Sequence, residues 1–286
     1  MSTPSPALPF RRLTPRDAAV CADLSQDRGW SREDHKWGLL LAAGTGYGLD
    51  APDGHGLLGA CVVTSYGPPR RPDLQAIGMV LVAERYARRG VGRRMMQHVL
   101  AEAGSTPLTL HATRSGQPLY EELGFTTVGQ VESVSGTFTP DGEAGPTRPA
   151  TADDLGSILR LDGEVFGSDR THVLTRLPAF ADRIRVAEDR GRLIGYAAIW
   201  PNTETEVIGP LVARDTATAQ ALVTSLAREA RRPVRVDVDT RHEAFLAWLH
   251  ARGLTTAFHN EVMVHGTAGL PGDWTRRFAP VTVAAA

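Results

Sequence analysis

The stretch IGMVLVAERYARRGVGRRMMQHVLAEAG, residues 77–104, holds the pattern that decides the fold of this chain. An apolar run of strand length leads into a turn that contains Gly90 and Gly92. Apolar side chains then recur at helical spacing from Val91 to Val99. The order of strand, glycine turn and amphipathic helix predicts a helix that begins at about Val91.

The start of this helix is suited to binding an anion. Its first amide N–H groups have no partner within the helix, and the helix dipole places partial positive charge there. The two glycines let the backbone turn tightly, and four arginines surround the turn: Arg88, Arg89, Arg93 and Arg94. A Walker loop is excluded because no Gly-Lys-Ser/Thr follows Gly92. We predict a phosphate site; the alternative is an ordinary turn with solvated arginines.

Composition narrows the class of partner. The 286 residues suffice for one large or two ordinary domains. The 31 Lys and Arg residues balance 32 Asp and Glu residues, so no overall charge favours nucleic acid or an anionic membrane. Cys21 and Cys61 are expected to be buried small hydrophobes. No apolar run reaches membrane-spanning length and the N-terminus lacks a signal core, so we expect a cytoplasmic protein. We also expect no metal site.

The two halves of the chain repeat one plan, which indicates an internal duplication. Three segments of the second half echo three of the first in the same order: 192–200 echoes 56–64, 207–213 echoes 76–83, and 245–254 echoes 117–125. A stretch rich in Pro and Gly, 138–149, separates the halves. We predict a first domain over 1–138, a linker over 139–147 and a second domain over 148–286, each of α/β or α+β class.

The second copy differs at the turn. After Ala213 it reads RDTATAQALVTSL, with no glycine and no arginine cluster, and Pro210 removes one N–H from the preceding strand. Leu249 takes the place of Tyr120. We therefore predict that only the first copy binds the anion. The segment 273–280 is expected to form a tail strand or clasp.

Together these features resemble the GNAT superfamily of acetyl-CoA-dependent acetyltransferases, in its tandem form with a degenerate second copy. The resemblance rests on ARRGVG, 87–92, between strand and helix, and on PLYEELGF, 118–125, downstream at the spacing of the family. Ala87 departs from the Gln or Arg that is usual at the first position. The resemblance implies two GNAT-like domains, each with a mixed, mostly antiparallel central sheet flanked by helices, and acetyl-CoA as cosubstrate.

The resemblance also implies functions for the residues of this chain that occupy the positions of the family's functional residues. Backbone groups of Leu81 and Val82 would pair with the pantetheine arm, and Tyr120 would be the general acid that protonates the leaving thiolate. Thr113 stands where the family often has an Asn that touches the cofactor. The pyrophosphate would be held by Arg88, Arg89, Gly90, Val91, Gly92 and Arg93.

A base and an acceptor pocket complete the hypothesis. His111 is the candidate base, because in the alternation from Leu108 it falls on the face opposite the leucines; the alternative is a structural histidine. Two groups of residues are candidates for the acceptor site: Trp30, Glu33 and Asp34 around the second helix, and Asp237 and Asp239 on one face of a strand. In each case the alternative is a solvated or salt-bridged surface.

The leading functional hypothesis is an N-acetyltransferase that moves acetyl from acetyl-CoA to a primary amine of a small molecule by direct attack, as a monomer or homodimer. A non-catalytic acyl-CoA-binding sensor or structural module is one alternative. Acetylation of a protein N-terminus or Lys is the other, and it predicts a shallow, open acceptor groove.

Overall fold

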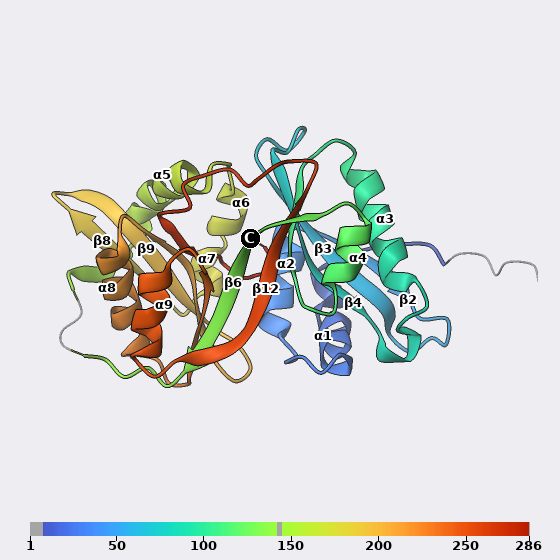
Figure 1. Ribbon diagram of the computed structural model, residues 1–286, viewed down its shortest axis with the longest axis horizontal. Coiled ribbons are helices and arrows are strands. Elements are labelled where there is room, and N and C mark those ends of the chain that lie inside the picture. The colour runs from blue at the N-terminus through green and yellow to red at the C-terminus, as the bar shows by residue number, and fades with distance from the viewer. Residues whose placement is uncertain (1–7, 142–144, 286) are drawn as a thin grey trace, which may run out of the picture.

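The computed structural model describes residues 8–141 and 145–285, which form two halves joined side by side (Figure 1). Each half alternates strands and helices in the same order, as the duplication predicts. The elements of the first half are β1 (Arg11–Leu13), η1 (Pro15–Asp17), α1 (Ala18–Asp27), α2 (Asp34–Ala43), β2 (Thr45–Asp50), β3 (Leu57–Tyr66), β4 (Leu74–Val82), η2 (Glu84–Tyr86), α3 (Val91–Ala103), β5 (Leu108–Ala112), α4 (Gln117–Glu122) and β6 (Thr126–Gly136).

The second half begins after the predicted linker, of which 142–144 lie outside the described residues. Its elements are β7 (Thr147–Pro149), η3 (Ala152–Asp154), α5 (Leu155–Phe166), α6 (Thr171–Leu174), α7 (Leu177–Phe180), β8 (Arg183–Asp189), β9 (Arg192–Pro201), β10 (Glu206–Ala213), α8 (Thr216–Ala227), β11 (Val234–Asp239), α9 (Glu243–His250), β12 (Thr255–His265) and β13 (Arg277–Ala279).

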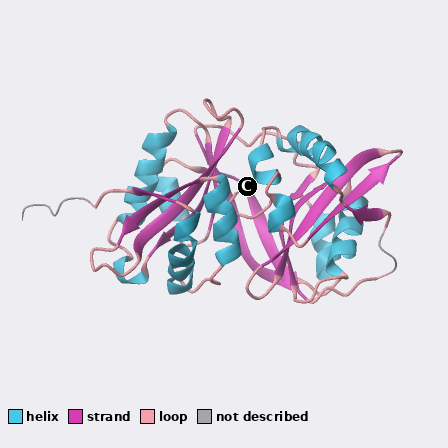
Figure 2. Cartoon of the chain, turned by 180° about the vertical axis from the view of Figure 1, so that it is seen from behind, coloured by secondary structure: helices cyan, strands magenta, loops and turns pink. Residues whose placement is uncertain are grey.

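One 13-stranded sheet runs through both halves, in the order β1-β2-β3-β4-β5-β12-β6-β11-β10-β9-β8-β7, with β13 paired to β10. The pairs β4–β5 and β10–β11 are parallel, and all other pairs in the described chain are antiparallel. The prediction of a mixed, mostly antiparallel sheet flanked by helices is therefore confirmed (Figure 2).

The halves exchange their last long strands. Strand β12 of the second half lies between β5 and β6, and β6 of the first half pairs with β11 (Figure 1). We predicted a central sheet in each half, whereas the two sheets are continuous. The two strands have similar starts, TTVGQVE and TTAFHNE, and each follows a short helix, so the local sequence suits either position. The domain limits remain a prediction.

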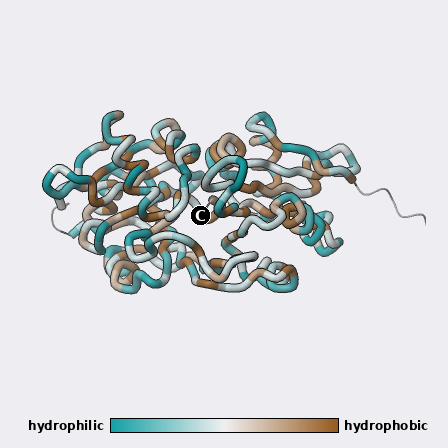
Figure 3. Tube along the Cα trace, turned by 90° about the horizontal axis from the view of Figure 1, so that it is seen from above, coloured by the Kyte–Doolittle hydropathy of each residue, from teal (hydrophilic) through white to brown (hydrophobic). Residues whose placement is uncertain are grey.

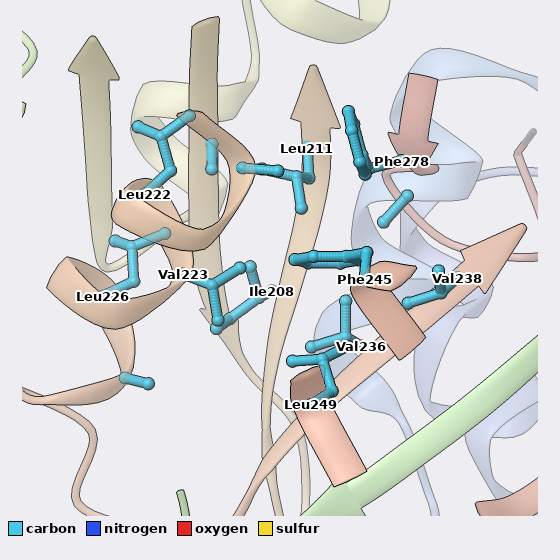
Figure 4. Packing of buried hydrophobic residues seen from close by; sticks show 14 of the residues in the cluster. Ile208, Leu211, Leu222, Val223, Leu226, Val236, Val238, Phe245, Leu249 and Phe278 are labelled. Atoms are coloured by element: carbon cyan, nitrogen blue, oxygen red, sulfur yellow. The ribbon is translucent and has the colours of Figure 1, made fainter. Parts of the chain in front are cut away.

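Apolar cores lie on both faces of the sheet, and hydrophilic turns lie mainly at its periphery (Figure 3). In the first half α3 begins at Val91, as predicted, and buries Met95, Met96 and Val99 against the sheet. In the second half α8 and α9 cover β10 and β11 with a core that contains Phe245 (Figure 4). Both cysteines are buried and free, as expected.

Candidate active site

The centre of the site is an irregularity in β4. Met79 adopts a φ of +53°, and the pairing of β3 with β4 shifts between Ala60 and Val62. A bulge of this kind redirects the strand and is common beside active sites. The parallel pairing of β4 with β5 ends at Ile77 and Leu110. The rest of β4 therefore has an edge that β5 does not cover.

A cleft of about 730 Å³ follows this edge. Its lining brings together the end of β4, the glycine turn, the start of α3, β5 and α4, together with residues of α2, β12 and the chain after β13. Of the residues predicted to bind the cofactor, those that line the cleft are Leu81, Val82, Arg88, Gly90, Val91, Gly92, Arg93 and Thr113. Arg89 differs, because its guanidinium lies 5.6 Å from the ring centroid of Tyr86.

The glycine turn leaves the start of α3 open. Gly90 precedes the helix with a φ of +77°, a left-handed conformation that favours glycine, and no side chain within the described chain caps the helix. A Cβ at Gly90 would meet no described atom within 4 Å. Since Arg88 and Arg93 line the cleft beside these amides, the turn combines convergent N–H donors with positive charge. These groups fit a phosphate.

Tyr120 lines the same cleft from α4. It is 8% exposed, and burial raises the pKa of its phenol, so that the hydroxyl carries its proton at neutral pH. Its ring lies beside Gly116, where a Cβ would come within 3.1 Å of Cε2. A larger residue at 116 would displace the ring, so Gly116 helps to position this candidate proton donor.

His111 faces the cleft from β5. Leu108 and Leu110 are in the core beneath α3, so the predicted orientation of His111 on the opposite face is confirmed. Its Nδ1 lies 2.9 Å from the carbonyl oxygen of Val283, which can only accept, so Nδ1 carries the proton in this bond. Burial, aided by the charge of Arg277, lowers the pKa of His111 to about 4. The imidazole is neutral at pH 7, and Nε2 is left as an acceptor.

The candidate acceptor residues are placed differently from one another. Trp30 lines the cleft and is 41% exposed, whereas Glu33 is buried and forms an ion pair with Lys36. Asp34 is an exposed residue whose carboxylate lies 3.0 Å from Nε of Arg32. Asp34 is therefore a salt-bridged surface residue, the alternative to an acceptor role, whereas Glu33 is not on the surface.

Asp237 and Asp239 face the same side of β11 but do not line the cleft. Asp237 accepts two hydrogen bonds from Arg235, at 2.8 and 3.0 Å, and one from Ser133 at 2.6 Å. Asp239 forms an ion pair with Arg241 at 3.1 Å and lines a separate cavity of about 10 Å³ behind His111. Asp237 is thus engaged through both oxygens, whereas Asp239 is engaged through Oδ1 and its buried Oδ2 has no hydrogen-bond partner among the described residues.

Several residues that line the cleft were not predicted. Lys36 comes from α2, Asn260 from β12, and Val283 and Ala284 from the chain after β13. Asn260 reaches the site because β12 is the exchanged strand, which no local pattern of residues indicates. Lys36 lies within a helix of buried apolar residues, where a buried lysine is rare without a partner.

Comparison with known proteins agrees with this geometry. Two family models, each described as an acetyltransferase (GNAT) domain, match residues 64–139 and 158–279. The uncharacterized N-acetyltransferase YitH of Bacillus subtilis is 32% identical over 196 residues, which cover 66% of this chain and 67% of YitH. The chain belongs to the GNAT acetyltransferases. It is an N-acetyltransferase with two GNAT domains in tandem.

Solved structures share the fold of this tandem GNAT acetyltransferase. A putative acetyltransferase from Pyrococcus horikoshii superposes with a TM-score of 0.83 at 17% identity, covering 100% of this chain and 98% of the other. A tandem GNAT protein from the clavulanic acid biosynthesis pathway gives a TM-score of 0.63 at 14% identity, covering 92% and 100% of the two chains. Within the described residues, no helix combines the length and apolar character needed to cross a membrane.

The second GNAT domain uses the matching strand edge differently. Ile208 of β10 occupies the place of Ile77, since the pairs Val63–Ile77 and Ile199–Ile208 correspond. Beyond Ile208, β10 pairs with β13, and the N–H of Ala213 donates to the carbonyl of Arg276 at 3.0 Å. The tail strand that the sequence predicts thus occupies this edge of the second domain.

Proposed function

We propose that this GNAT acetyltransferase transfers an acetyl group from acetyl-CoA to the primary amine of a small molecule by direct attack. The observation that carries the proposal is one continuous cleft, which connects the open start of α3 with Tyr120 and His111. The bound cosubstrate supplies an activated acetyl thioester. Its pyrophosphate would contact the amides of Val91 to Arg93 and the guanidinium of Arg88.

The backbone of β4 has a second role in this proposal. The bulge at Met79 redirects the strand where the edge facing β5 becomes uncovered. Leu81 and Val82 line the cleft, but the N–H of Ala83 donates to Leu58 of β3, so by alternation the N–H of Leu81 also points to β3 and that of Val82 to the open edge. The Val82 N–H is therefore the candidate to pair with the pantetheine arm or to stabilise negative charge on the reacting carbonyl oxygen. This leaves the side chains of Tyr120 and His111 for proton transfer.

Proton transfer is divided between two side chains. The C–N bond forms as the C–S bond breaks, and the Tyr120 hydroxyl donates its proton to the departing sulfur. The proton lost by the amine nitrogen passes to Nε2 of His111, the nitrogen left free by the bond to Val283. With a pKa of about 4, His111 releases this proton readily, which allows Tyr120 to regain one for the next cycle.

A small acceptor is favoured over a protein because the acceptor side of the cleft is covered. Asn260 of the second domain and the tail residues Val283 and Ala284 line it, and Ala284 lies against Gly78 of β4. A protein N-terminus or lysine would be better served by a shallow groove without these side walls. The second domain therefore contributes a wall of the active site in addition to its own fold.

The proposal is tested by following thiol release from acetyl-CoA in the presence of a panel of amines, amino acids, polyamines and aminoglycosides. We expect amine-dependent release with ternary-complex kinetics, and no burst of acetyl-enzyme. Tight binding of acetyl-CoA without turnover of any amine would instead identify a sensor module. A burst of covalent acetyl-enzyme would contradict direct attack.

A further inference from the structure

The charges that line the cleft are mainly positive. Arg88 and Arg93 lie at the start of α3, whereas Arg28 and Lys36 line the part of the cleft contributed by the first two helices and the chain that joins them. Among the described residues that line the cleft, Glu84 is the one carboxylate, and it forms an ion pair with Arg28. An acceptor therefore meets cations in this cleft and no unengaged carboxylate of the described chain.

The carboxylates nearby lie behind these cations. Glu33 forms an ion pair with Lys36, whose side chain is 6% exposed, and Asp237 holds Arg235. Neither carboxylate lines the cleft, whereas Lys36 does. Burial lowers the pKa of Lys36, whereas the adjacent Glu33 carboxylate acts to raise it and so favours the ammonium form. Lys36 thus reaches the cleft while its counterion stays within the protein, an arrangement that suits an anionic group.

Asn260 supplies a neutral group on the same surface. It is 4% exposed, its amide oxygen is buried, and this oxygen has no hydrogen-bond partner among the described residues. Asn260 is two residues from Val262, which pairs with His111, so both side chains are on one face of the sheet. A buried polar atom without a partner is unfavourable, and an amine N–H would satisfy it.

We propose that the acceptor carries an anionic group beside its amine, as an amino acid does, with the carboxylate held by Lys36 and the amine directed to Asn260 and His111. This inference rests on the proposed acetyl transfer. Polyamines and aminoglycosides are disfavoured, because each would place a second positive charge against Lys36 or Arg28. A single carboxylate instead finds an ammonium partner that is already partly removed from water.

The test compares free amino acids with their α-amides in the thiol-release assay. The α-amine of an amide is less basic, so more of it is neutral, and this bias favours the amide. We nevertheless expect kcat/KM to be at least tenfold higher for the free acid than for the amide. Such a ratio would report recognition of the carboxylate. In the double variant Glu33→Gln/Lys36→Met the preference is expected to disappear through a higher KM for the acid, while the amide is turned over as before.

Two further measurements keep the result interpretable. Lys36→Arg is expected to retain a preference for the acid, and acetyl-CoA binding by calorimetry is expected to be unchanged in all three proteins, which also reports that they fold. Faster turnover of polyamines than of any amine with a carboxylate would overturn this inference and leave acetyl transfer intact. Failure to acetylate any amine would overturn both proposals together.

Discussion

The two GNAT domains present the same strand edge with opposite outcomes. Past Ile77 the edge of β4 lines a cleft, whereas past Ile208 the matching edge of β10 is paired with β13. In the second domain the chain itself satisfies the backbone group of Ala213. The comparison shows that the same strand edge can either line a cleft or have its hydrogen bonds taken up by another segment of the chain.

The side chains at corresponding positions of the two domains also differ in whether they face the cleft. The pairs Ile77–Leu110 and Ile208–Val236 correspond, so Asp237 is the counterpart of His111. Within the described residues His111 uses one ring nitrogen, Nδ1, in a hydrogen bond to a carbonyl group, while Asp237 is held by Arg235 and Ser133. The first domain presents its group to the cleft, and the second engages its group with Arg235 and Ser133.

The largest effect is expected when a carboxylate is placed at the open turn. Gly92→Glu sets a negative charge against the phosphate, and such like-charge contacts cost several kcal/mol. We expect kcat/KM for acetyl-CoA to fall by roughly 10²-fold or more in steady-state assays. Ala217→Glu, at the exposed second position of α8 in the second domain, is the matched control and is expected to have no effect. Equal losses in both variants would remove the distinction between the domains.

Loss of the phenol is expected to have the next effect. Tyr120→Phe removes the proton donor and keeps the ring, so kcat should fall by about 10²-fold with little change in acetyl-CoA affinity. The converse change, Leu249→Tyr, should give no gain of activity and should lower the melting temperature, because Leu249 is fully buried in the core of the second domain. Wild-type kcat in Tyr120→Phe would show that the leaving thiolate needs no acid from α4.

Two glycines let the tail approach the two strands, and they provide a matched pair. A Cβ at Gly78 would overlap Ala284, and a Cβ at Gly209 would overlap the carbonyl of Pro280. We expect each Ala substitution to reduce the free energy of unfolding by about 1–3 kcal/mol in denaturant titrations. Gly78→Ala should also reduce kcat, because it displaces the segment that holds His111. If Gly209→Ala reduces kcat equally, the tail does not act locally on His111.

The smallest effect concerns pH. With a pKa of about 4, His111 is already neutral at pH 5.5, so kcat/KM for the amine should rise with pH according to the acceptor's own pKa, without an inflection near 6.5. Unfolding exposes this imidazole and restores its ordinary pKa, so its contribution to stability is complete above about pH 6.5 and is lost as the pH falls toward 4. His111→Gln should flatten that part of the stability profile; an inflection near 6.5 in wild-type activity would contradict the burial of this group.

Local patterns accounted for much of the first domain, because its strand, glycine turn and helix are contiguous. The helix start at Val91 and the orientation of His111 follow from the spacing of residues along single elements. Lys36 and Asn260 could not be found in this way, because their position depends on packing between elements distant in the chain. The roles of Tyr120 and the turn remain predictions that the geometry supports.

The exchange of β6 and β12 has a consequence for the history of this protein. The copy that carries the glycine turn is completed by a strand encoded in the copy that lacks it, and that copy in turn is completed by a strand of its neighbour. After the duplication, mutations could erase the second anion site, but deleting the second gene segment would open the sheet of the first beside β5. On the prediction that only the first domain binds acetyl-CoA, selection for that activity also preserves the second domain.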